Sequence, residues 1–227
     1  MIIDFIVLAC SHKYGGRCLA GIDLTHRKLI RLISNDTATY CAIPTNFCYY
    51  NGIELEPLVK INVNLIEKAP DDGAQTENYY VSFPLILRIV GKATLTEIEP
   101  FEYQIIFSPL PFGTIDEYLN GDTYKYLTHS LCLIFVHNIS IENTYNDNGE
   151  PKTKVEFDVF INNDEAFKNE RYSVTDPRYI IYKDNSTNRM KKTFIESAYL
   201  LISLGPADGG SNYYSKYVSG IIDATNP

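Results

Sequence analysis

The chain has 227 residues and a formal charge of −8, which argues against a protein that holds nucleic acid through overall basicity. No apolar run approaches the roughly 18 residues of a membrane-spanning helix, and the opening MIIDFIVLACSHK lacks the basic start of a secretory signal. The five cysteines are an odd number, so we predict a cytoplasmic protein with buried thiols, no disulfide framework and no membrane contact.

The first half of the chain predicts a series of β-strands. Apolar stretches rich in Ile and Val, bounded by glycine and polar clusters, are typical of strands. They fall at Ile2–Cys10, Cys18–Leu24, Leu29–Ser34, Leu58–Ile66 and Asn78–Phe83. The segment Phe83–Phe101 has apolar residues at helix-compatible spacing but contains Gly91 and Pro100, so its type stays open.

The second half predicts one helix and the remaining strands. Thr114 followed by Glu117 forms a capping-box pattern, which predicts a helix over Thr114–Leu127. The turn Asp147–Gly149 joins two strand-like runs and predicts a hairpin. The strands predicted here are Leu131–Ile141, Lys154–Ile161, Tyr172–Thr175, Tyr179–Lys183, Ala198–Leu204 and Tyr217–Asp223.

These elements predict an all-β fold with a minor helix. About eleven or twelve strands are too many for one open sheet, so the edges close either as two small barrels or as one sandwich. No repeat or linker separates two halves. Two units, if present, therefore pack closely together.

Charge is unevenly distributed along the chain. Between His12 and Arg31 five basic side chains face a single acid, Asp23, whereas between Glu54 and Asp122 twelve acids face four basic residues. This segregation allows a local basic patch on an acidic protein; the alternative is an ordinary solvated surface.

The segment Lys13-Tyr14-Gly15-Gly16-Arg17 is the first candidate for ligand binding. Two glycines between two cations let the backbone turn sharply, so that amide groups and both cations can face a phosphate or carboxylate. It lacks the ending and the following helix of a nucleotide-binding P-loop. The alternative is a plain turn between strands.

Three further groups could contact a ligand. The amides of Gln75 and Asn78 could contact a base edge, and Glu77 could pair with Arg17 or Arg31, although such side chains more often tie a loop to the fold. The segment Asp176-Pro177-Arg178 favours a turn in the same way. Tyrosines beside polar loops could stack on bases, or could simply pack the strands. These are Tyr49, Tyr50, Tyr79, Tyr80, Tyr213, Tyr214 and Tyr217.

No catalytic constellation emerges from the sequence. The four histidines are scattered and no metal-ligand spacing occurs. Cys18 with His12 is the one conceivable nucleophilic pair, but a buried strand cysteine explains Cys18 better. We therefore predict no enzyme activity, cofactor or metal.

Several of these segments, taken in order, resemble the dual OB-containing domain family. They are SHKYGGRCLAGIDL (Ser11–Leu24), LIRLIS (Leu29–Ser34), AQTENY (Ala74–Tyr79), YSVTDPRY (Tyr172–Tyr179) and ISLGPADGGSNYYSKYVSGII (Ile202–Ile222). The resemblance implies two OB-type barrels in one compact unit, which we place at residues 1–111 and 112–227, and a role in sensing nucleic acid in prokaryotic defence. The sequence departs from the family pattern at Leu29, where an aromatic is usual, and at Ser215, where cysteine is common.

The sequence thus predicts a non-catalytic module that recognises single-stranded or modified nucleic acid, or a nucleotide. The alternative is a protein-interaction or regulatory subunit that binds no nucleic acid, which the acidic middle stretch favours. The candidate ligand-binding residues are Lys13, Gly15, Gly16, Arg17, Arg31, Gln75, Asn78, Asp176 and Arg178.

Overall fold

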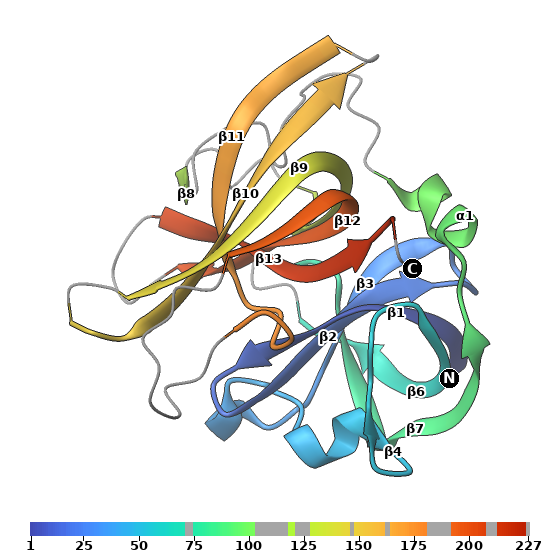
Figure 1. The fold of residues 1–227 in the computed structure, drawn as a ribbon. Helices are drawn as coiled ribbons and strands as arrows, with labels where there is room; N and C mark the ends of the chain where they lie inside the picture. The colour runs from blue at the N-terminus through green and yellow to red at the C-terminus, as the bar shows by residue number, and fades with distance from the viewer. Residues whose placement is uncertain are drawn as a thin grey trace.

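The structure is a computed structural model, and it describes residues 1–70, 75–102, 118–120, 128–145, 148–161, 164–180, 192–207 and 213–225. Within these ranges the chain is almost entirely β, as predicted (Figure 1). The strands are β1 (Ile2–Lys13), β2 (Gly16–Asp23), β3 (Lys28–Ile33), β4 (Tyr49–Tyr50), β5 (Ile53–Glu54), β6 (Val59–Lys68), β7 (Asn78–Lys92), β8 (Tyr118–Asn120), β9 (Leu131–Tyr145), β10 (Pro151–Ile161), β11 (Asp164–Val174), β12 (Lys192–Ala207) and β13 (Tyr213–Asp223). The helices are α1 (Leu95–Ile98) and the 3₁₀ turns η1 (Thr37–Thr39), η2 (Thr45–Cys48) and η3 (Glu99–Phe101). None of the described helices is long and apolar enough to cross a membrane.

The first five long strands close into a barrel. Strands β1, β2 and β3 form an antiparallel meander, β3 then pairs in parallel with β7, and β6 closes the ring by pairing antiparallel with both β7 and β1. In chain order this is the arrangement 1-2-3-5-4, which is the strand order of an OB fold.

The second sheet repeats this topology. Strands β9, β10 and β11 form a meander, β11 pairs in parallel with β13, and β12 pairs antiparallel with both β13 and β9. The short strand β8 adds to the outer edge of β13. The chain therefore contains two OB-like barrels, and the sandwich alternative is wrong.

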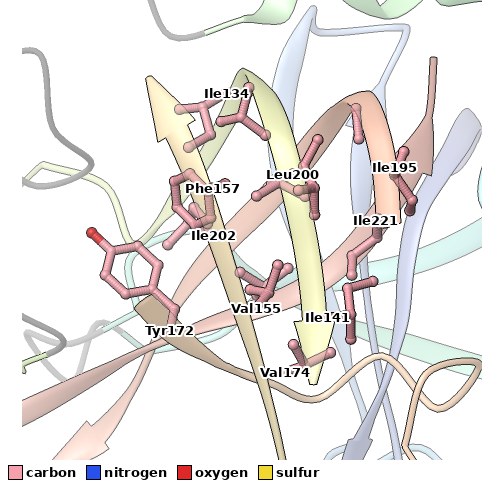
Figure 2. Close-up of a cluster of buried hydrophobic side chains, with 14 of the residues drawn as sticks. Ile134, Ile141, Val155, Phe157, Tyr172, Val174, Ile195, Leu200, Ile202 and Ile221 are labelled. Carbon is pink, nitrogen blue, oxygen red and sulfur yellow. The ribbon is translucent and has the colours of Figure 1, made fainter. Parts of the chain in front are cut away.

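Each barrel has its own core, and a third cluster joins them. The second barrel is filled by side chains such as Phe157, Leu200 and Ile221, which point inward from different strands (Figure 2). A separate cluster combines Ile6 and Leu8 of β1 with partners from the second barrel, including Leu133 of β9 and Leu201 of β12, all at most 1% exposed. The two barrels thus share a continuous apolar interface.

The close approach of β1 and β13 explains a glycine at this interface. A Cβ at Gly220 would lie 2.2 Å from the carbonyl oxygen of Leu8 and 3.0 Å from Cβ of Ala9. Real Cβ atoms essentially never come as close as 2.2 Å to another heavy atom, so a side chain at position 220 would force β1 and β13 apart.

Some expectations were wrong or fall outside the described residues. Tyr118–Asn120 is a strand, so the helix predicted over Thr114–Leu127 is wrong there, and the rest of that range lies outside the described residues. Tyr179 lies in a turn, not in a strand, and residues 181–183 are not described. The boundary placed near residue 111 also lies outside the described residues. The predicted hairpin is confirmed, because β9 and β10 pair antiparallel.

Candidate ligand pocket between the two barrels

A pocket of about 250 Å³ opens where the two barrels meet. The first barrel contributes the β1–β2 hairpin with Lys13, together with Arg31 of β3 and Gln75. The second barrel contributes the stretch after β11, the end of β12 with Leu204, and Tyr217 of β13. Its described lining includes two cations and no carboxylate, although the chain carries a net charge of −8. The electrostatics of this pocket therefore differ from those of the whole protein.

Arg31 is the most unusual residue of this pocket. Its side chain is among the largest fully buried ones, and the residue is only 2% exposed. Nη1 donates to Oδ1 of Asn78 at 2.9 Å and to Oγ of Ser130 at 3.1 Å. Nη2 has no hydrogen-bond partner, and Arg31 forms no ion pair, among the residues that the structure describes. Because an unpaired buried charge is costly, this guanidinium is suited to an anionic or carbonyl-bearing ligand.

The segment before β7 holds Arg31 in place and ties the barrels together. The amide of Gln75 donates to the carbonyl oxygen of Leu204 at 2.9 Å, across the interface, and its Oε1 accepts from Nδ2 of Asn78 at 3.3 Å. The carboxylate of Glu77 accepts from the backbone N–H of Ser130 and, at 2.7 Å, from its hydroxyl. The Glu77 carboxylate, which could have paired with Arg17 or Arg31, binds Ser130 instead, while the backbone carbonyl of Glu77 accepts from the N–H of Arg31 at 2.9 Å.

The β1–β2 hairpin has a local explanation for both of its glycines. The register pairs Lys13 with Gly16, which leaves a two-residue loop with φ of 39° at Tyr14 and 80° at Gly15. Two positive φ values in such a loop define a type I′ turn, where glycine is favoured at the second position. A Cβ at Gly16 would lie 2.6 Å from the carbonyl oxygen of Ile43. The turn and this contact account for the glycines without a ligand.

Arg17 does not join Lys13 and Arg31 around one pocket. Its guanidinium binds Oε1 of Glu54 through Nε at 3.0 Å and Nη2 at 2.8 Å, and it lines a different cavity of about 200 Å³. Nη1 also contacts the ring of His12, which lines the first pocket. Burial lowers the pKa of His12, and the Arg17 charge lowers it further against the opposing effect of Glu54. The charged form of His12 is therefore disfavoured in the folded protein.

Asp176 and Arg178 form a closed structural unit beside this second cavity. Asp176 is 3% exposed and accepts hydrogen bonds from Nε and Nη2 of Arg178, at 3.0 and 2.6 Å, and from the backbone N–H of Ile221 at 3.1 Å. Arg178 also donates to the carbonyl oxygen of Ile221 at 2.5 Å. These bonds anchor the segment after β11 to β13. The candidate residues are thus divided between two cavities.

Sequence reasoning missed most of the second barrel's share of the pocket. Thr175 and Leu204 line it because the end of β11 and the end of β12 meet the hairpin, as in the hydrogen bond from the N–H of His12 to the carbonyl oxygen of Thr175 at 2.9 Å. Both segments belong to those that resemble the family, but no local pattern in them indicates that they meet the hairpin. Of the tyrosines singled out beside loops, Tyr217 lines this pocket.

The strand topology agrees with a comparison against known protein families. The model of the dual OB-containing domain matches residues 3–221, nearly the whole chain. The chain belongs to the dual OB-containing domain family. No curated protein and no solved structure matched the chain in the corresponding comparisons.

Membership in the dual OB-containing domain family allows the position of the pocket to be compared with the usual ligand-binding surface of an OB fold. OB folds generally serve as binding modules, which hold their ligands on the face of strands 2 and 3 and with the loops between strands 1 and 2 and strands 4 and 5. In the first barrel these loops are the Tyr14–Gly15 turn and the segment between β6 and β7 that contains Gln75. The pocket lies at both of them and at β3.

Metal chemistry finds no support in the described part of the dual OB-containing chain. Within those ranges no group of three or more His, Cys, Asp or Glu side chains is arranged to hold a metal ion. Cys18 and His12 both line the pocket, and the register partner of Cys18 on β1 is Ser11, whose hydroxyl donates to the Cys18 backbone carbonyl at 3.3 Å. The lining supplies hydrogen-bond donors and ring faces suited to binding.

Proposed function

We propose that this protein is a non-catalytic recognition module that binds single-stranded nucleic acid, with one nucleotide unit held in the pocket between the barrels. The observation that carries the proposal is the buried guanidinium of Arg31, whose Nη2 has no partner among the described residues. A phosphate or a base carbonyl would accept from Nη2 once the side chain turns toward the entering ligand, since this atom has almost no solvent-accessible surface in the structure. Lys13 supplies a second cation, and Tyr217 supplies a ring.

The size of the pocket supports a single strand. Pockets for drug-sized ligands measure about 300–1,000 Å³, so about 250 Å³ accommodates one base or one sugar-phosphate unit. In a duplex the bases are stacked and paired, and a base enters a pocket only after flipping out. A single strand, in which bases are already accessible, meets no such penalty.

The two cations of the pocket, Lys13 and Arg31, set the expected salt dependence of binding. If Lys13 and Arg31 each contact a phosphate, each contact to a single strand contributes roughly −0.7 to the slope of log affinity against log salt. We therefore expect a slope of roughly −1.4, which is shallow. A strongly basic binding protein would give a much steeper slope.

The test is a titration of a fluorescently labelled single-stranded oligonucleotide, followed by anisotropy at several salt concentrations. The Lys13→Ala variant should bind more weakly, with a slope reduced by roughly 0.7. Lys152→Ala is the matched control, because Lys152 is an exposed lysine of β10 outside the pocket lining. Equal binding by the wild type and Lys13→Ala, or no binding by the wild type, would refute the proposal.

A protein partner is the second candidate, and exposed apolar side chains support it. Ile2 is 63% and Ile66 54% exposed, on paired strands β1 and β6 whose register places Ile2 opposite Asn64. This function predicts no oligonucleotide binding at physiological salt. It also predicts a stoichiometric protein complex in a pull-down that Ile66→Asp abolishes.

A further inference from the structure

Two exposed tyrosines stack on each other at the rim of the pocket. Tyr14 at the tip of the β1–β2 hairpin lines the pocket, and its ring lies 4.4 Å from that of Tyr40, with an angle of 27° between the planes. The two residues are 62% and 63% exposed. The stacked pair therefore keeps more than half of each tyrosine accessible to solvent.

Neither ring is explained by packing. The described hydrophobic clusters of the two barrels and of their interface do not include Tyr14 or Tyr40. Apart from their mutual contact, these rings bury little surface on folding. A stability argument alone therefore gives no reason for a tyrosine at either position.

The backbone makes tyrosine an unfavourable choice at both positions. Tyr14 has φ of 39° and Tyr40 has φ of 52°, both in the left-handed region, which bulky residues rarely adopt. Tyr14 occupies the first central position of a type I′ turn, where Asn is preferred. Tyr40 ends η1 with left-handed geometry, a place that favours Gly or Asn. Strain of this kind at a site that lacks packing points to a functional use of the side chain.

We propose that the Tyr14–Tyr40 pair is a stacking surface for the base next to the one in the pocket, so that the ligand is a strand of at least two nucleotides. This inference rests on the proposed function and extends it. Lys13, adjacent to Tyr14 and itself in the pocket lining, is placed to contact the phosphate that joins the two nucleotides.

The experiment compares the affinity of an eight-nucleotide single strand with that of mononucleotides. The wild type should bind the strand more tightly. Tyr40→Asn and Tyr14→Asn should each reduce the ratio of strand affinity to mononucleotide affinity by about 5- to 150-fold, which corresponds to the loss of one stacked base. Tyr14→Phe and Tyr40→Phe keep the rings and should retain the wild-type ratio.

The Asn variants are expected to fold, because asparagine suits a left-handed backbone. Thermal melting followed by circular dichroism checks this. Independently of any variant, a strand that carries 2-aminopurine should lose fluorescence on binding the wild-type protein, because stacking quenches this base.

The outcomes separate the two proposals. Suppose that mononucleotides bind, but that the strand binds no more tightly or that the Asn variants keep the wild-type ratio of strand affinity to mononucleotide affinity. Either result would refute the stacking surface but leave the proposed binding in the pocket intact. If a strand with 2-aminopurine binds without quenching at any position, the stacking surface is likewise overturned. If neither mononucleotides nor strands bind the wild type, the proposed function fails and the inference falls with it.

Discussion

Replacement of Arg31 by methionine should strongly weaken the binding of a single-stranded oligonucleotide while leaving the fold intact. Methionine fills a similar volume but removes the charge. The loss of Nη1 leaves Oδ1 of Asn78 without this donor, which costs about 1–3 kcal/mol, whereas Ser130 keeps its bond to Glu77. Removal of a buried charged group with an unpaired Nη2 recovers a similar amount. We expect the free energy of unfolding to change by less than about 2 kcal/mol.

The affinity of Arg31→Met for a single-stranded oligonucleotide should fall much further than its stability. One hydrogen bond to a charged group contributes about 1.5–3 kcal/mol, which corresponds to roughly 10- to 150-fold weaker binding. Because the chain contains no tryptophan, urea unfolding is best followed by far-UV circular dichroism, and binding by anisotropy. Arg88→Met is the control, since Arg88 is exposed on β7 and outside the pocket lining.

Two results would contradict this reasoning. Unchanged affinity in Arg31→Met would show that the guanidinium does not contact the ligand. A loss of more than about 4 kcal/mol in the free energy of unfolding, with normal affinity in the folded fraction, would also contradict it. Arg31 would then be a structural residue whose hydrogen bonds stabilise the fold by more than the burial of its charge costs.

Three further predictions concern the pocket and the interface. Burial and the Arg17 charge lower the pKa of His12 in the folded state, so the free energy of unfolding should fall as the pH drops below about 6.5. His12→Gln should remove the His12 contribution to this pH dependence, measured by urea titrations between about pH 5 and 7. Gly220→Ala should destabilise the protein by at least about 1–3 kcal/mol in urea unfolding, because its Cβ would meet the Leu8 carbonyl; an unchanged midpoint would show that the barrels are free to separate. In a Cys41→Ser background, which removes the other half-buried thiol, bound oligonucleotide should slow maleimide labelling of Cys18, and an unaltered rate would place the ligand elsewhere.

The strands were predictable because their apolar runs are long and bounded by turns. Over Phe5–Cys10 the apolar residues of β1 are not interrupted by polar ones, and this lack of alternation indicates that both faces of the strand are buried. Phe5 and Val7 point into the first barrel, whereas Ile6 and Leu8 point into the shared interface, so both faces are buried. A strand buried on both faces has no polar alternation. Such runs therefore mark the strands along which the barrels meet.

The helix predicted over Thr114–Leu127 is wrong at Tyr118–Asn120, because a local capping pattern does not determine how a segment pairs in the fold. Thr114 and Glu117 match a capping box, and so do Thr94 and Glu97, which form the actual box at α1: the N–H of Thr94 donates to Glu97 at 2.9 Å. The local pattern alone does not decide which segment continues as a helix. Tertiary pairing determines this, as the pairing of β8 with β13 shows.

The candidate site was only partly predictable from the sequence. The patterns identified Lys13, Arg31 and Gln75, which the fold does bring to one pocket. They also grouped Arg17 with these residues, although Glu54, distant in sequence, pairs with it beside another cavity. Which cation pairs with a carboxylate and which remains in a pocket depends on contacts between distant strands, and the sequence contains no local trace of them.

The most direct test of the account is a chemical-shift map. The ¹⁵N-labelled protein is titrated with a short single-stranded oligonucleotide, and the backbone amide signals are followed. We predict that the largest changes occur on both walls of the pocket, around Lys13 and Arg31 in the first barrel and around Leu204 and Tyr217 in the second. Changes confined to one barrel, or to the outer face of β10 and β11, would contradict a binding site between the barrels.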